Sequence, residues 1–79
     1  MTLRLLFIGR LQDVAGAPEQ LSNADAATVA ELIAALDPLL AVELRSDKVR
    51  IAVNGVVAGR EARLAEGDEV AFLPPVSGG

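Results

Sequence analysis

The chain has 79 residues, a formal net charge of −4, and neither cysteine nor histidine. This length fits one domain near the lower limit for folding on a core of its own. The apolar fraction of 52% excludes a disordered chain, and the negative charge with only two aromatic residues argues against a nucleic-acid binder. The apolar runs are too short to cross a bilayer and the N-terminus lacks a signal-peptide layout, so we expect a cytoplasmic protein.

Two strands are predicted near the N-terminus. Residues 2–9 are short, almost continuously apolar and closed by Gly9, which indicates a strand. Residues 10–15 then predict either one helical turn or a loop, and residues 19–23 predict a short second strand.

A helix is predicted to follow. Thr28-Val29-Ala30-Glu31 has the form of a capping box, in which the Thr hydroxyl and the Glu carboxylate satisfy amides at a helix start. Apolar residues then recur at i, i+3, i+4 and i+7, which places one stripe on one helix face: Val29, Leu32, Ile33 and Leu36. Asp37-Pro38 is expected to end this helix, and residues 39–42 to cover part of the core.

The second half of the chain predicts three strands. Residues 48–54 alternate, with Val49, Ile51 and Val53 on one face. Asn54-Gly55 is a strong hairpin signal, so residues 56–58 are expected to form the return strand. Residues 64–69 predict a turn. Residues 70–73 predict a final strand, which ends because the two prolines after it cannot donate to a ladder.

This order of elements predicts an α+β fold, with one main helix packed on one face of a mixed sheet of four or five strands. The first and last strands are the most continuously apolar, so we expect them side by side at the centre of the sheet. Residues 1–75 then form the domain, and residues 76–79 form a flexible tail that leaves from a central strand.

Few side chains could carry chemistry. Glu66, Asp68 and Glu69 could act as an acid–base pair or could simply form a solvated turn. Without histidine or cysteine, and without further carboxylates at useful spacing, no metal site is predicted. Five of the seven basic residues lie between Arg45 and Arg63, which fits either a phosphate or protein-docking patch or ordinary solvated loops.

Apolar residues on three of the predicted strands allow two interpretations. Phe7, Val57 and Leu73 could form an exposed patch that marks a partner site, or they could belong to the core. Strand register decides between the two.

The C-terminal segment is Pro74-Pro75-Val76-Ser77-Gly78-Gly79. The prolines favour an extended exit from the domain, and two glycines can enter a channel too narrow for other residues. The terminal carboxylate is ionised at neutral pH and is therefore a poor electrophile, so a partner enzyme must activate it. The segment thus indicates a carrier, the alternative being a frayed end or an expression remnant.

Three stretches carry a resemblance to a known family: LLFIGRL at residues 5–11, AVNG at 52–55 and GDEVAFLPPVSGG at 67–79. With these, the whole chain resembles the small subunits of molybdopterin synthase, which are ubiquitin-like sulfur carriers of the β-grasp fold. Carriers for thiamine synthesis share this fold and the terminal Gly-Gly, but they tend to lack the preceding Pro-Pro-Val.

The resemblance implies a mechanism centred on Gly79. An ATP-dependent activating enzyme adenylates its carboxylate, and sulfur from a cysteine desulfurase or rhodanese-type donor replaces AMP to give a thiocarboxylate. This group then donates sulfur to cyclic pyranopterin monophosphate in molybdenum cofactor biosynthesis. Gly78 is the slim residue that lets the end pass. The residues implied to face partners are Phe7, Leu73, Pro74, Pro75, Val76 and Ser77.

By the same resemblance, the chain is not an enzyme on its own and binds no cofactor or metal. The catalytic pocket belongs to the large subunit, and two large and two small chains form a heterotetramer. Two alternatives stay open: a sulfur carrier for the thiamine pathway or for tRNA thiolation, and a ubiquitin-like interaction module or protein modifier joined to lysines through Gly79.

Overall fold

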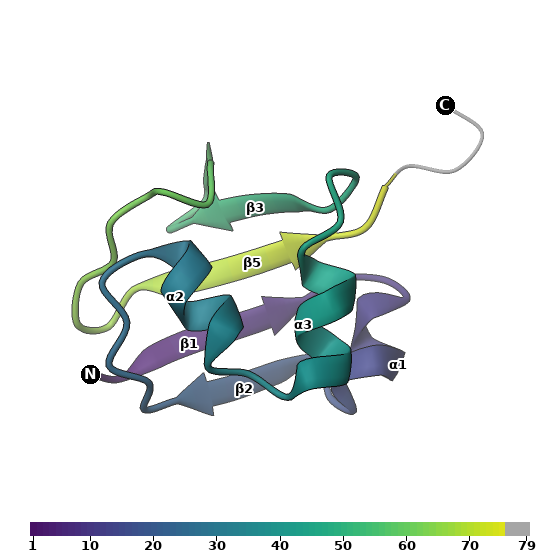
Figure 1. Ribbon diagram of the computed structural model, residues 1–79, viewed down its shortest axis with the longest axis horizontal. Coiled ribbons are helices and arrows are strands. Elements are labelled where there is room, and N and C mark those ends of the chain that lie inside the picture. The colour runs from purple at the N-terminus through teal and green to yellow at the C-terminus, as the bar shows by residue number, and fades with distance from the viewer. Residues whose placement is uncertain (76–79) are drawn as a thin grey trace.

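Five strands form one mixed sheet in residues 1–75, the part of the chain that the computed structural model describes (Figure 1). The strand order across the sheet is β2-β1-β5-β3-β4. The strands are β1 (Leu3–Phe7), β2 (Glu19–Ser22), β3 (Arg50–Val53), β4 (Val56–Ala58) and β5 (Glu69–Leu73). Three short helices lie between them: α1 (Leu11–Ala15), α2 (Val29–Ala34) and α3 (Pro38–Leu44).

The first and last strands lie side by side at the centre of the sheet, which confirms the expectation from their apolar runs. They run parallel, and the register pairs Leu5 with Val70 and Phe7 with Phe72. Their other neighbours, β2 and β3, are antiparallel to them. Because parallel neighbours end at the same edge of a sheet, the ends of β1 and β5 lie together.

Two helices of similar length cover one face of the sheet (Figure 1), so the expectation of one main helix was wrong. Helix α2 already ends at Ala34, three residues before Asp37, and Asp37-Pro38 instead begins α3. Asp37 accepts hydrogen bonds from the amides of Leu39 and Leu40 at 2.9 and 3.4 Å, and Pro38 occupies the first turn. An acidic cap followed by proline is a favoured helix start, which the sequence interpretation missed.

The start of α2 follows the predicted capping pattern. The Thr28 hydroxyl accepts a hydrogen bond from the Glu31 amide at 3.3 Å, and the Glu31 carboxylate accepts one from the Ala27 amide at 3.3 Å. Val29, Leu32 and Ile33 are buried against the sheet. Within the described residues, every helix falls short of the length and hydrophobicity needed to cross a bilayer.

The predicted hairpin forms at Asn54-Gly55, where φ is +51° and +83°. Positive φ at both central residues matches a hairpin turn that follows the twist of the strands. The Asn54 side chain donates to a carboxylate oxygen of Asp68 at 2.9 Å and accepts from the Glu69 amide at 3.0 Å. Asn54 therefore ties the β3–β4 hairpin to the turn that leads into β5.

Replacing Asn54 with alanine is expected to lower the free energy of unfolding by about 2 kcal/mol, because it adds backbone strain at positive φ and removes both side-chain bonds. Asn54→Gly removes the same bonds but tolerates positive φ, so its loss should be smaller. Urea unfolding of the two variants measures the difference. Equal losses would show that the backbone conformation of residue 54 contributes nothing.

Candidate functional site

The last described residues are held at the central edge of the sheet. The Ile8 amide donates to the Phe72 carbonyl at 3.0 Å, just where β1 and β5 end. Pro74 packs against Gly9 so closely that a Cβ at Gly9 would lie 3.2 Å from the Pro74 Cγ. Gly9 has φ of +57°, so it also takes a backbone conformation that suits glycine. The root of the C-terminal segment is therefore packed against rigid structure.

The predicted site residues Gly78 and Gly79, together with Val76 and Ser77, lie outside the described residues, so their roles stay predictions. Of the other predicted partner-facing positions, Leu73, Pro74 and Pro75 are partly exposed at the central edge.

The prediction that Phe7 faces a partner was wrong. Its side chain is 1% exposed and stacks on Phe72 with ring centroids 5.6 Å apart, so it belongs to the core beneath the helices. The next residue, Ile8, is 41% exposed, and its amide donates to the Phe72 carbonyl near the C-terminal root. Sequence reasoning missed Ile8, because a continuous apolar run does not show which alternate residues face the core.

The other face of the sheet carries no helix and presents an apolar row. The register places Leu6 beside Ala71, Ala71 beside Ala52, and Ala52 beside Val57, so the row crosses four strands. Leu73 lies on the same face two positions beyond Ala71. These side chains are partly exposed, and Val57 is 71% exposed. We name the set the open-face patch: Leu6, Ala52, Val57, Ala71 and Leu73.

Charged residues border the open-face patch on the side away from Pro74. The Arg4 Nε donates to a carboxylate oxygen of Glu19 at 2.6 Å, and its Nη1 lies 3.9 Å from a carboxylate oxygen of Glu69. This hydrogen bond, with the negative charge of Glu19, raises the pKa of Arg4 above its ordinary value. Arg4 is therefore a permanent positive charge between two carboxylates, and it closes one border of the patch.

The acidic turn before β5 has a structural role. A carboxylate oxygen of Glu66 accepts from the Thr2 amide at 2.9 Å, and one of Asp68 accepts from the Ala65 amide at 2.8 Å. Gly67 supplies the positive φ of the turn, at +83°. In residues 1–75, no group of three or more acidic residues is placed to hold a metal ion.

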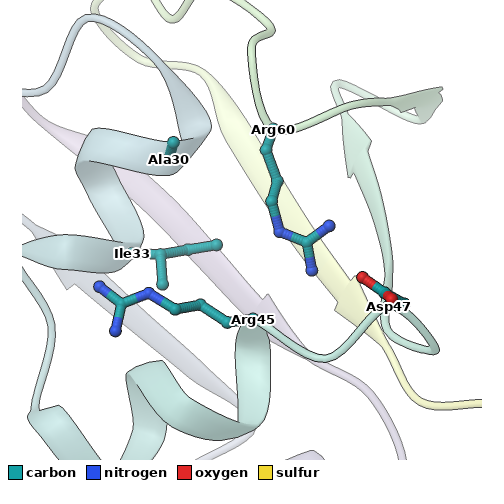
Figure 2. A pocket seen from close by; sticks show the side chains of 5 residues that line it. All are labelled: Ala30, Ile33, Arg45, Asp47 and Arg60. Carbon is teal, nitrogen blue, oxygen red and sulfur yellow. The ribbon is translucent and has the colours of Figure 1, made fainter.

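The basic residues between Arg45 and Arg63 do not form one patch. Arg45 and Arg60 line a pocket on the helical side, with Ala30, Ile33 and Asp47 (Figure 2). Arg50 instead pairs with Leu73 at the edge of the open face.

Residues 5–79 match the ThiS family. The chain belongs to the ThiS family. This ThiS-family chain is 35% identical over 80 residues to the molybdopterin synthase sulfur carrier subunit of Escherichia coli strain K12, a match that covers 98% of the chain and 99% of that relative.

Solved structures share the fold of this ThiS-family chain. The crystal structure of SAMP1 from Haloferax volcanii is 31% identical, with a TM-score of 0.83 and full coverage of both chains. A chain in the complex of subunits 1 and 2 of the molybdopterin-converting factor from Helicobacter pylori 26695 is 25% identical, with a TM-score of 0.70 and full coverage of both. The predicted ubiquitin-like β-grasp fold is confirmed.

Proposed function

We propose that this chain is the sulfur-carrier subunit of a molybdopterin synthase. The observation that carries the proposal is the full-length similarity to an E. coli protein of that name. The family match extends to residue 79 and so includes the terminal Gly-Gly. The packing of Pro74 against Gly9 supports it, because a carrier needs a fixed root from which its reactive end can reach into a partner.

The reactive group in this proposal is the carboxylate of Gly79. A carboxylate oxygen attacks the α-phosphorus of ATP on the activating enzyme, pyrophosphate leaves, and an acyl adenylate results. The carbonyl carbon is then open to attack. The outer sulfur of a persulfide on a cysteine desulfurase or rhodanese-type donor attacks the carbonyl carbon and displaces AMP, which gives an acyl disulfide. A thiol reductant then cleaves the S–S bond, so that the thiocarboxylate is released and the donor cysteine is left in a disulfide with that thiol. ATP is consumed on the activating enzyme, and this chain holds no cofactor.

The thiocarboxylate is then delivered to the large subunit, where it donates sulfur to cyclic pyranopterin monophosphate. Four residues follow Pro75, and when extended they span at most about 14 Å. That length takes the end of the chain from the sheet edge into a pocket of a partner. The chain thus supplies the sulfur and the large subunit supplies the catalytic pocket.

The open-face patch is the surface that we assign to the large subunit. It lies on the helix-free face and reaches the root of the C-terminal segment at Leu73. A partner docked there would lie next to the segment that it must receive. The complex of two subunits in the Helicobacter pylori relative supports such an association.

Replacing Val57 with aspartate is expected to weaken binding to the cognate large subunit by about ten-fold or more, because a charge would be buried against an apolar partner surface. The matched control is Leu39→Asp, which places the same charge at a position 79% exposed on α3, on the helical side. Calorimetric titration of both variants measures the affinities. Equal losses would contradict the assignment of the open-face patch.

The proposed chemistry is tested by mass spectrometry of the C-terminal peptide, after incubation of the chain with the activating enzyme, ATP and a sulfur donor. A peptide ending in Gly79 with one oxygen replaced by sulfur is expected. The peptide is measured because oxidation of Met1 gives the same nominal change in the intact mass. If no cognate enzyme adenylates Gly79, the proposed mechanism is wrong.

A second candidate, a protein modifier, is favoured by one observation. The chain is 29% identical to another structure from Haloferax volcanii, which is named small archaeal modifier protein 1, with a TM-score of 0.80. A modifier would use the same activated carboxylate but transfer it to lysine amines. Lysine conjugates that survive denaturation, without sulfur at the terminus, would favour this candidate.

A thiamine-pathway or tRNA-thiolation carrier would share the thiocarboxylate chemistry. A deletion strain separates these functions. Loss of molybdoenzyme activity is expected, whereas thiamine auxotrophy or loss of thiolated tRNA would contradict the proposed pathway.

A further inference from the structure

A pocket of about 330 Å³ opens on the helical side of the sheet (Figure 2). Its walls come from three segments: α2, the turn after α3 and the loop after β4. The residues that line it are Ala30, Ile33, Arg45, Asp47 and Arg60. None of them belongs to the open-face patch, so the pocket is a separate surface.

Arg60 is fixed at both its backbone and its side chain. Its carbonyl accepts from the Ala30 amide at 2.8 Å, and its Nη2 donates to the carbonyls of Leu44 and Ser46 at 3.1 and 2.8 Å. Among residues 1–75, its Nε and Nη1 groups have no acceptor. A guanidinium held in place with spare N–H donors can bind an anion at a lower entropic cost.

The charges of the pocket favour a singly charged anion. Arg45 and Arg60 against Asp47 give one net positive charge, in a chain whose net charge is −4. In the described part of the chain, neither arginine forms an ion pair. Arg45 is exposed, and its long side chain can turn toward an anion at the mouth of the pocket.

The apolar part of the pocket favours an aliphatic stem beside that charge. The apolar wall next to the two arginines is made mainly by the exposed Ala30 and only at its edge by Ile33, whose side chain is 1% exposed (Figure 2). A carboxylate on a short CH₂ chain would contact this wall and Arg60 together. A doubly charged phosphate would be repelled by the Asp47 carboxylate and has no apolar stem.

We propose that this pocket binds the carboxylate of a glutamate side chain on a partner protein, through Arg60 and Arg45 over the wall made by Ala30 and Ile33. The pocket is partly open to solvent, which suits a side chain presented by another surface. A partner held here would leave the open-face patch and the C-terminal segment accessible, so the inference is independent of the proposed sulfur chemistry.

The test is an NMR titration of the full isotope-labelled chain at constant ionic strength. The probes are N-acetylglutamate α-amide, its neutral glutamine isostere, and inorganic phosphate. The glutamate probe is expected to give saturable shifts at the pocket amides, and the glutamine probe is not. Equal responses to both amides, tighter binding of phosphate, or shifts that do not saturate would each overturn the proposal.

Variants strengthen the test because the pocket contains positive and negative side chains, and each kind of charge can be removed separately. Arg45→Gln is expected to weaken binding of the glutamate probe about five-fold, and Asp47→Asn to strengthen it by a similar factor. Lys48→Gln removes one positive charge next to the pocket without changing its lining, so it should have little effect. All three residues are exposed, and the same spectra report whether the variants fold. Equal effects of Arg45→Gln and Lys48→Gln would overturn the proposal in favour of general attraction.

Discussion

Deletion of Gly79 is expected to abolish sulfur transfer and to leave the free energy of unfolding within about 0.5 kcal/mol of the full chain. The stability should be kept because the buried residues of the core lie between Leu3 and Phe72, before the C-terminal segment. Sulfur transfer should be lost because the terminal carboxylate of the shortened chain lies about 3.5 Å short of the position that Gly79 reaches in the proposed chemistry. Peptide mass spectrometry measures the thiocarboxylate, and urea unfolding measures the stability.

A second variant tests whether sulfur transfer depends on the length of the C-terminal segment or on the absence of a side chain at residue 79. Gly79→Ala keeps both the length and the terminal carboxylate but adds a Cβ. If the partner channel requires a slim end, this variant should also lose transfer while folding normally. Sulfur transfer by the deletion variant would contradict the assignment of Gly79, and a large loss of stability would contradict the separation of tail and domain.

Phe72→Ala is expected to lower the free energy of unfolding by about 3–5 kcal/mol. The side chain is fully buried on a central strand, and its ring stacks on Phe7 with an interplanar angle of 16°. A domain of this size has a total stability of about 4–12 kcal/mol, so the loss removes a large part of it, and the midpoint of thermal unfolding should fall by about 12 °C or more. Thermal and urea unfolding followed by far-ultraviolet circular dichroism measure the loss.

Phe72→Leu is the matched control, because it keeps an apolar side chain and most of the volume. Its loss should be well below that of Phe72→Ala. A loss below about 1 kcal/mol for the alanine variant would mean that the ring is not packed as the structure describes.

Local signals in the sequence predicted much of the fold. Asn54-Gly55 requires positive φ at both residues, so the hairpin could be placed without knowledge of the rest of the chain. The alternating sequence also placed Val49, Ile51 and Val53 on one face of the strand, and this is the face of β3 that packs toward the core. The central position of β1 and β5 followed from their burial, which their composition already indicated.

The errors came from features that depend on distant parts of the chain. Phe7 and Ile8 are adjacent and both apolar, and only the pairing with β5 and the packing of the helices decide which one is buried. The helix α3 was missed because Asp37-Pro38 was interpreted only as an end. Its role as a start depends on Leu40 and Leu44 finding a core to pack against.

The pocket could not be predicted for the same reason. The sequence showed that Arg45 and Arg60 belong to a basic stretch, but not that they share a pocket. They line one pocket because the Arg60 guanidinium donates to the carbonyl of Leu44, at the end of α3, and to that of Ser46 just after it, while the Arg60 carbonyl accepts from α2. Their placement depends on the tertiary arrangement of three segments.

The parallel pairing of β1 with β5 also determines how the domain bears mechanical load. The chain begins at one end of β1 and leaves from the opposite end of β5, so a pull between Met1 and Pro75 is directed along the two strands (Figure 1). That direction shears the backbone bonds between them together, whereas a pull across the strands would open them one after another. A force on the C-terminal end against Met1 therefore acts along the direction in which the backbone bonds between β1 and β5 resist it together.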